Sequence, residues 1–207
     1  MAGFLTINYN DRMIYKIAHF LRDSIPWLWD GIDILNSYLF TILFGKKIKK
    51  FKFSIDHSGY ELVSIKEVPT DKLVAFFAKQ PKEAYTYFKP HKFDYKSIKK
   101  LQRNMSFLAY LLIDSANGNI AGYCFNRSFF HGKGFRGRMV DINYRGKGLG
   151  TLMNKILNEV GFGLGLRLYE TVNKKNVASY KSAISASKVN VIEEMEDGDL
   201  LLEILKD

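Results

Sequence analysis

Apolar side chains follow a helical period in the first part of the chain. Up to about residue 50 they recur three and four positions apart, and Gly45 is expected to close this helical segment; the recurring positions are Leu28, Ile32, Leu35, Leu39 and Ile42. Two alternating, strand-like stretches follow at 51–55 and 61–68, separated by a turn at Ser58-Gly59. The pattern predicts a mostly helical N-terminal extension at 1–58 and a second unit at 59–207.

The rest of the chain alternates between strand and helix patterns. Helices are expected from Thr70 and from near Asp94, with an aromatic loop at 85–93 between them, and strands at 106–114, 120–130 and 136–144. The clearest helix begins at Leu149 and ends at a glycine-rich stretch, 161–165. A strand at 167–172, a helix at 176–187 and two strands around Asp197-Gly198 complete the order. This order predicts a mixed α/β domain with a sheet flanked by helices.

Composition and charge narrow the kind of partner. The 207 residues are 47% hydrophobic and 25% charged, which is typical of a folded globular protein. The net charge is +10, and the seven acidic residues and one lysine from Glu193 onward leave 30 basic and 14 acidic residues before it. Such a basic surface favours an anionic partner: a nucleic acid, a membrane face or a phosphorylated small molecule.

Several classes of protein and site are not expected. The single cysteine, Cys124, excludes an internal disulfide and a multi-cysteine zinc site, and its apolar neighbours predict a buried thiol. No metal site is expected. The N-terminus does not have the pattern of a secretory signal, and the apolar stretch 25–44 is interrupted by polar residues, so no transmembrane helix is expected. These features favour a cytoplasmic protein.

The segment between the strand at 136–144 and the clearest helix has the features of an anion-binding loop. It reads Arg145-Gly146-Lys147-Gly148-Leu149-Gly150-Thr151. Glycines allow the backbone to approach a ligand closely, and a helix N-terminus presents unpaired N–H groups with a partial positive charge. Arg145 and Lys147 add full charges. The glycine spacing matches neither a nucleotide triphosphate loop nor a dinucleotide fingerprint.

This loop resembles the R-x-x-G-x-G/A signature of the GNAT acyltransferases at Arg145, Gly148 and Gly150. Element order extends the resemblance over residues 60 to 207. It implies a GNAT-like, mainly antiparallel twisted sheet, a loop whose amides hold the pyrophosphate of acetyl-CoA, and a pantetheine arm between the fourth and fifth strands. Main-chain groups of Val140 and Ile142 would then pair with the pantetheine.

A second element is similar to the N-x-x-[A/S] sequence that opens a helix after the fifth strand in many members of this family. Here Asn176 and Ser179 match it, which implies a contact with the cofactor and places the family's general-acid position on Ala183. Counting from Asn173 instead places that position on Tyr180. Both registers stay open, and packing of Tyr180 on the helix with its hydroxyl at the surface is the alternative.

Acid–base candidates come from charges in apolar surroundings. Amide formation needs a neutral amine and a protonated thiol leaving group. Asp141 and Glu170 each lie among apolar residues of a predicted strand, where an unpaired charge is costly; either is a general-base candidate, and for Asp141 the alternative is an ion pair with an arginine such as Arg138. His91 and Phe93 of the aromatic loop are expected to contact the acceptor.

The function that we expect is N-acetylation of a small-molecule primary amine, with an amino sugar or sugar nucleotide favoured by the aromatic loop. A protein or peptide N-acetyltransferase and a basic nucleic-acid-binding module, with stacking rings such as Phe51, Phe53 and Tyr87, are the alternatives. The segment 25–52, with tryptophans followed by lysines, also fits a peripheral membrane contact, an internally packed helix or a homodimer contact.

Overall fold

The computed structural model describes residues 26–54, 56–195 and 197–206, and the side chains of the first helix from Asp30 onward. From β1 (Tyr60–Ser64) onward, the order of helices and strands is the one that the hydrophobic pattern predicts. The helices are α2 (Pro26–Lys50), α3 (Thr70–Lys79), α4 (Tyr95–Arg103), α5 (Leu149–Leu164) and α6 (Val177–Ile184). The strands are β1 (Tyr60–Ser64), β2 (Phe107–Asp114), β3 (Ile120–Ser128), β4 (Lys133–Val140), β5 (Arg167–Asn173), β6 (Val189–Glu194) and β7 (Asp199–Ile204).

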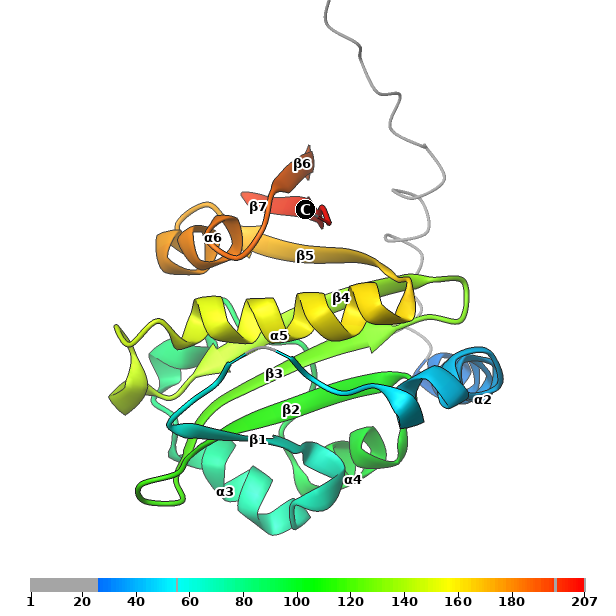
Figure 1. Cartoon of the computed structure of the whole chain (residues 1–207), viewed down its shortest axis with the longest axis horizontal. Coiled ribbons are helices and arrows are strands. Elements are labelled where there is room, and N and C mark those ends of the chain that lie inside the picture. The colour runs from blue at the N-terminus through cyan, green and yellow to red at the C-terminus, as the bar shows by residue number, and fades with distance from the viewer. Residues whose placement is uncertain (1–25, 55, 196, 207) are drawn as a thin grey trace, which may run out of the picture.

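The strands form one seven-stranded sheet in the order β1-β2-β3-β4-β5-β7-β6. Every neighbouring pair is antiparallel except β4 and β5, which run parallel. The predicted mixed α/β fold with a mainly antiparallel sheet is therefore confirmed. In Figure 1, β5, β7 and β6 diverge from the flat body of β1 to β4, and α5 lies across the point of divergence.

Alternation along β3 shows how the two sheet faces are covered. Tyr123 and Phe125 pack with α3 and α4 on one face, whereas Cys124 packs against α5 on the other. Burial raises the pKa of the Cys124 thiol to about 12, which agrees with the predicted buried, unreactive cysteine. A third cluster joins the end of α5 to β5, β7 and Phe40 of α2.

The N-terminal segment departs from its prediction in three ways. Gly45 does not close the helix, which continues to Lys50. The predicted strand at 51–55 is irregular over residues 51–54, because Phe51 and Phe53 pack onto the clusters around α5 instead of pairing with a strand. Within α2, the apolar positions that set the helical period are mostly exposed, while Asp33, Asn36 and Phe40 are buried.

The predicted strand 136–144 ends at Val140, and residues 142–144 form a short 3₁₀ turn instead. Among the described helices, none is long and apolar enough to cross a membrane. Because α2 places Phe40 in the same cluster as β5 and β7, the extension and the domain share part of one core, and the predicted division at 58/59 stays a prediction.

Candidate active site

The anion-binding loop lies between the 3₁₀ turn and α5. Gly146 and Gly148 both have a φ of 77°, a left-handed conformation that glycine adopts without strain. Gly148 is the N-cap of α5, and a Cβ atom at either glycine would meet no heavy atom within 4 Å. The loop is thus an open backbone cradle at the N-terminus of a 16-residue helix.

Leu149 and Gly150 pack this loop against the rest of the protein, whereas the charged loop residues are exposed. Leu149 is buried in the cluster on the α5 face of the sheet. Gly150 lies against α6, since a Cβ atom there would be 3.3 Å from the Cβ of Ser182. Arg145 is exposed, and the Lys147 ammonium lies 4.7 Å from the centre of the Tyr144 ring. Thr151 occupies the first turn of α5.

The parallel strands β4 and β5 separate beside this loop. Their ladder has three pairs, from Lys133 opposite Arg167 to Phe135 opposite Tyr169, and none beyond. Val140 therefore lies on a part of β4 that has no partner on the β5 side. Ile142 does not lie on this strand, because it is in the 3₁₀ turn, where 45% of its surface is exposed. The implied pairing of its main chain with pantetheine stays a prediction.

Glu170 is the centre of a buried ion cluster. Its Oε2 accepts hydrogen bonds from Arg136 Nε at 2.6 Å and Arg138 Nη1 at 2.9 Å, and the side chain is 2% exposed. Burial alone would raise the pKa of Glu170, but the two guanidinium groups outweigh it and hold the pKa below its ordinary value. This Glu170 ion cluster favours a structural role over a general base, which needs a basic and accessible carboxylate.

Arg138 extends the Glu170 ion cluster to α6. Its Nη2 donates to the carbonyl oxygen of Ser179 at 2.7 Å and to Ser182 Oγ at 2.8 Å. Asn176 caps α6, because its Oδ1 accepts from the backbone N–H of Ser179 at 3.2 Å. The Asn176–Ser179 match thus has a clear structural role, and a contact of either residue with the cofactor stays a prediction.

The candidate general acid lies on the same helix. Tyr180 is half-buried and packs against the cluster formed by the end of α5, β5 and β7. The alternative register points to Ala183, a fully buried residue without an acidic proton. Of the two registers, only the one that gives Tyr180 supplies an acid, and this role stays a prediction.

Asp141 lies at the end of β4 and faces α3. Its Oδ1 accepts from the backbone N–H of Asn143 at 2.9 Å, which caps the 3₁₀ turn, and its Oδ2 accepts from Gln80 Nε2 at 2.7 Å. The predicted alternative, an ion pair with Arg138, is wrong, because Arg138 faces Glu170 on the opposite side of the sheet. Asp141 is 4% exposed and still lines a cavity.

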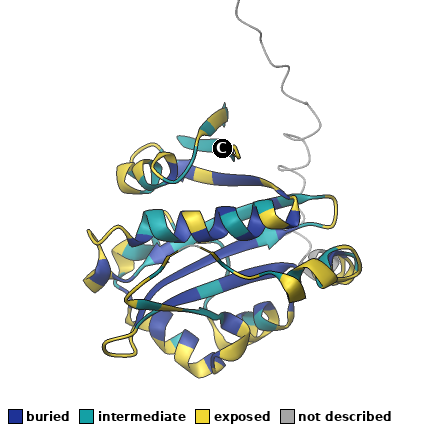
Figure 2. Cartoon of the chain, viewed as in Figure 1, coloured by how far each residue is buried: buried dark blue, intermediate teal, exposed yellow. Residues whose placement is uncertain are grey.

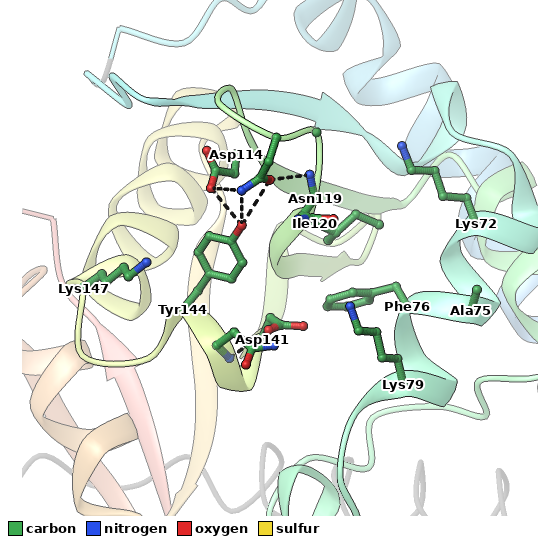
Figure 3. A pocket seen from close by; sticks show the side chains of 13 residues that line it. Lys72, Ala75, Phe76, Lys79, Asp114, Asn119, Ile120, Asp141, Tyr144 and Lys147 are labelled. Atoms are coloured by element: carbon green, nitrogen blue, oxygen red, sulfur yellow. Dashed lines mark hydrogen bonds between the residues drawn. The ribbon is translucent and has the colours of Figure 1, made fainter.

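That cavity has a volume of about 490 Å³ and separates α3 from the loop. Figure 3 shows Lys72 and Lys79 of α3 on one side, Tyr144 and Lys147 on the other, and Asp141 between them. The β2–β3 turn forms a third wall, where Asp114 accepts a hydrogen bond from the Tyr144 hydroxyl at 2.8 Å. Backbone and hydroxyl hydrogen bonds hold the pKa of Asp114 below its ordinary value. The cavity is therefore polar and contains both signs of charge.

A smaller cavity of about 300 Å³ is lined by Gln80, Phe93, Phe77 and Tyr85. Gln80 donates to Asp141, so this hydrogen bond joins a residue that lines the smaller cavity to one that lines the larger cavity. Gln80 Oε1 is buried and has no hydrogen-bond partner. Phe93 thus lines a cavity close to Asp141, as expected for an acceptor-contacting residue, although contact with an acceptor stays a prediction.

His91 lies in a ring of aromatic side chains beside this cavity. Its Nδ1 is 2.9 Å from the carbonyl oxygen of Lys92 and therefore carries the proton, so Nε2 accepts a hydrogen bond from the Tyr123 hydroxyl at 3.0 Å. Burial lowers the pKa of His91 to about 4, although its hydrogen bond to the Lys92 carbonyl opposes this. With both nitrogens engaged, His91 holds the aromatic loop on β3 rather than acting as a base.

Sequence reasoning missed four contributors to the site: Gln80, Tyr123, Lys72 and Lys79. A glutamine after a helix and lysines on an exposed helix face have no distinguishing pattern. Gln80 meets Asp141 across 61 residues of chain, and the two lysines share only a cavity lining with Asp141 and Lys147. Among the described residues, no group of three or more His, Cys, Asp or Glu side chains could hold a metal ion.

Comparison with known proteins shows the fold. No protein-family model matches the chain, and no curated protein matches it by sequence. Among solved structures, the ribosomal-protein-S5-alanine acetyltransferase from Vibrio fischeri is similar with a TM-score of 0.61 and 15% identity, over 73% of this chain and 95% of that one. The GNAT domain of PAT from S. lividans gives a TM-score of 0.60 and 15% identity, over 70% and 89%.

A third similar structure contains the donor. The Campylobacter jejuni N-acetyltransferase PseH in complex with acetyl coenzyme A matches with a TM-score of 0.53 and 17% identity, over 72% of this chain and 99% of that one. All three matches cover at least 70% of this chain, so the chain shares the overall fold of these proteins. The chain therefore has the fold of the GNAT N-acetyltransferases.

Proposed function

We propose that this protein transfers an acetyl group from acetyl-CoA to the primary amine of a small molecule. The observation that carries the proposal is the open glycine cradle at Gly146–Gly148, which begins α5 beside the point where β4 and β5 separate. A similar structure holds acetyl coenzyme A. The proposed activity belongs in the cytoplasm, where acetyl-CoA is made and used.

The residues present fit the donor. The N–H groups of residues 146–151 would hold the pyrophosphate, with Arg145 and Lys147 adding charge. Val140, whose main chain is unpaired on the β5 side, would bind the pantetheine. Asn154 of α5 is fully buried, and its Oδ1 has no hydrogen-bond partner, so an N–H donor of the pantetheine would satisfy it.

Bound acetyl-CoA supplies an activated thioester carbonyl in a ternary complex with the amine. The amine nitrogen forms a bond to this carbonyl carbon, the carbon–sulfur bond breaks, and the proton lost by the amine is balanced by protonation of the thiolate. Asp141 would accept the amine proton on the face that carries the acceptor cavities, through water where contact is not direct. Tyr180 of α6 would protonate the sulfur.

The acceptor that fits the larger cavity carries phosphate as well as the amine. Lys72 and Lys79 project from α3, and the described part of the chain pairs neither with a carboxylate. Both carboxylates of the cavity already accept hydrogen bonds from the protein. The cavity is lined by three lysines (Lys72, Lys79 and Lys147) and two carboxylates (Asp114 and Asp141), so its net charge is positive. The asparagines of the β2–β3 turn add groups for hydroxyls. An amino sugar linked to a nucleotide has this chemistry.

Measuring thiol release from acetyl-CoA tests both the proposed acetyl transfer and the proposed acceptor. A panel should contain free amino sugars, nucleotide-linked amino sugars, polyamines and peptides with a free N-terminus. We expect the nucleotide-linked amino sugars to have the lowest KM, and the double variant Lys72→Gln/Lys79→Gln to raise that KM at least about tenfold without changing acetyl-CoA affinity. Lys96→Gln/Lys99→Gln, on the exposed side of α4, is the charge-matched control.

The outcomes separate the donor from the acceptor proposal. If none of the amines in the panel causes thiol release, N-acetylation is contradicted. Preferential release with peptides would favour a protein N-acetyltransferase. Equal KM values for free and nucleotide-linked sugars would contradict the proposal that Lys72 and Lys79 of the larger cavity bind a phosphate of the acceptor. The nucleic-acid alternative loses support from Phe51 and Phe53, which are partly buried against the protein core, whereas Tyr87 is exposed.

A further inference from the structure

Helix α2 exposes apolar side chains over the whole of its outward side. Of the fourteen large hydrophobic residues that are exposed in the described part of the chain, six lie on this one helix. They are Ile32 (39% exposed), Ile34 (67%), Leu35 (58%), Tyr38 (65%), Ile42 (59%) and Leu43 (56%). Figure 2 shows that α2 lies at the margin of the molecule and carries exposed residues. Here they are called the α2 surface, and their concentration indicates a contact with another body.

The polar side of α2 holds the helix in this orientation. Asn36 is 4% exposed; its Nδ2 donates to Ser106 Oγ and to the carbonyl oxygen of Ser128, both at 2.9 Å, and its Oδ1 accepts from the N–H of Phe130. One turn earlier, Asp33 accepts from Asn104 Nδ2 at 2.9 Å. Rotating the helix to bury its apolar side would break these buried hydrogen bonds, so the α2 surface faces outward by construction.

A block of positive charge continues the α2 surface at its C-terminal end. Lys46, Lys49, Lys50 and Lys52 are exposed, and the described part of the chain pairs none of them with an acid. Lys47 differs, because its ammonium approaches the carbonyl oxygen of Leu164. The two acids of the helix are engaged elsewhere: Asp30 pairs with Lys100 and Asp33 with Arg127. The charge left at this end is therefore only positive.

We propose that the α2 surface binds the face of a bilayer that contains anionic lipids, with α2 lying in the plane of the interface. Apolar side chains would enter the boundary between headgroups and acyl chains, and the lysines would meet lipid phosphates. A second copy of the chain fits less well, because the copy's α2 offers these lysines no unpaired carboxylate. The helix cannot cross the membrane, so the contact is peripheral. This inference is independent of the proposed acetyl transfer.

Co-sedimentation of the full chain with vesicles tests the inference. Vesicles of phosphatidylcholine alone are compared with vesicles that contain about one third phosphatidylglycerol, at low and high salt. We expect binding only to the anionic vesicles, and weaker binding in high salt. The variant Leu35→Gln/Ile42→Gln keeps the net charge and both side chains are exposed, so it should fold normally and lose at least about tenfold in binding.

Two controls make the result specific. Tyr95→Gln removes from α4 a large side chain that is about as exposed as Leu35 and Ile42. This variant should bind vesicles like the parent. Lys46→Gln/Lys49→Gln should weaken binding only at low salt. Failure of the parent to bind anionic vesicles at low salt would overturn the inference, as would equal binding by Leu35→Gln/Ile42→Gln. A dimer in solution that the same double variant converts to a monomer would also overturn it, since a second copy would then occupy the α2 surface.

Discussion

At the scale of single residues, the glycine cradle makes the sharpest demand on the sequence. Gly148 has a left-handed φ and no protein atom near the position of a Cβ, so Gly148→Val would strain the backbone and place a side chain where the phosphates must lie. We expect this variant to lose acetyl-CoA binding in calorimetry. Gly132→Val is the matched control, because Gly132 has a φ of 85° and equally open surroundings in the β3–β4 turn. It should be destabilised to a similar degree, by about 1–2 kcal/mol, and still bind. Equal binding by both variants would mean that the loop is only a turn.

Asp141 offers a substitution that changes the chemistry with little change in structure. In Asp141→Asn, the Gln80 amide can turn over so that its Oε1, which has no partner in the parent, accepts from the new Asn Nδ2 instead of Nε2 donating to Oδ2, while the cap on the 3₁₀ turn is kept. We therefore expect normal stability and normal acetyl-CoA affinity with a turnover at least about tenfold lower near neutral pH. The loss should shrink at high pH, where the amine is already neutral. A parent-like pH–rate profile in a stable Asp141→Asn protein would remove Asp141 from the mechanism.

His91 predicts a dependence of stability on pH. Its pKa is about 4 in the folded chain and about 6.5 in an unfolded chain, so the unfolded state binds more protons between these values. The stabilisation is complete above about pH 6.5 and is lost as the pH falls toward 4. We expect a loss of about 2 kcal/mol in the free energy of unfolding over this window, less than the full pKa shift implies because the ring keeps some exposure. Urea denaturation should show that the free energy of unfolding of His91→Phe depends less on pH over this window than that of the parent. An equal pH dependence in the two proteins would contradict the lowered pKa of His91.

At the scale of elements, the Glu170 ion cluster joins β4, β5 and α6 where the sheet separates. Glu170→Gln would leave Arg136 and Arg138 buried without a counter-charge, at a cost of about 3–5 kcal/mol. The control is Glu203→Gln, whose partner Arg167 is 58% exposed, with an expected cost of at most about 1 kcal/mol. Chemical denaturation measures both. A Glu170→Gln protein of parental stability whose turnover falls would show that Glu170 acts in the chemistry instead.

The order of elements could be predicted because each buries one periodic apolar face, as the run from Leu149 to Val160 on α5 shows. The end of β4 could not, since Ile142 and Tyr144 continue the apolar pattern of the strand and only the cap by Asp141 turns the chain. The orientation of α2 was hidden for a related reason: its apolar positions predict a buried side, whereas Asn36 and Asp33 form the buried one. The signature loop was visible because its glycines are adjacent in sequence, but the Asp141–Gln80 pair joins residues 61 positions apart.

At the scale of the whole molecule, charge, loop and fold lead to one account. The chain carries a net charge of +10, the cradle at the start of α5 is open, and similar folds belong to acetyltransferases that use an anionic donor. The larger cavity, with Lys72 and Lys79, extends the same argument to an anionic acceptor, and the α2 surface extends it to an anionic membrane. The donor, acceptor and membrane proposals can each fail while the other two hold. Donor binding is the claim on which the proposed activity rests.

The most direct test of that claim is calorimetric titration of the full chain with acetyl-CoA at low salt and again at high salt. We predict a dissociation constant in the micromolar range at low salt that rises severalfold at high salt, because the donor carries about four negative charges. Arg145→Ala should weaken binding by about 1–3 kcal/mol while the protein stays folded. A folded parent protein that gives no binding heat at low salt would contradict the account.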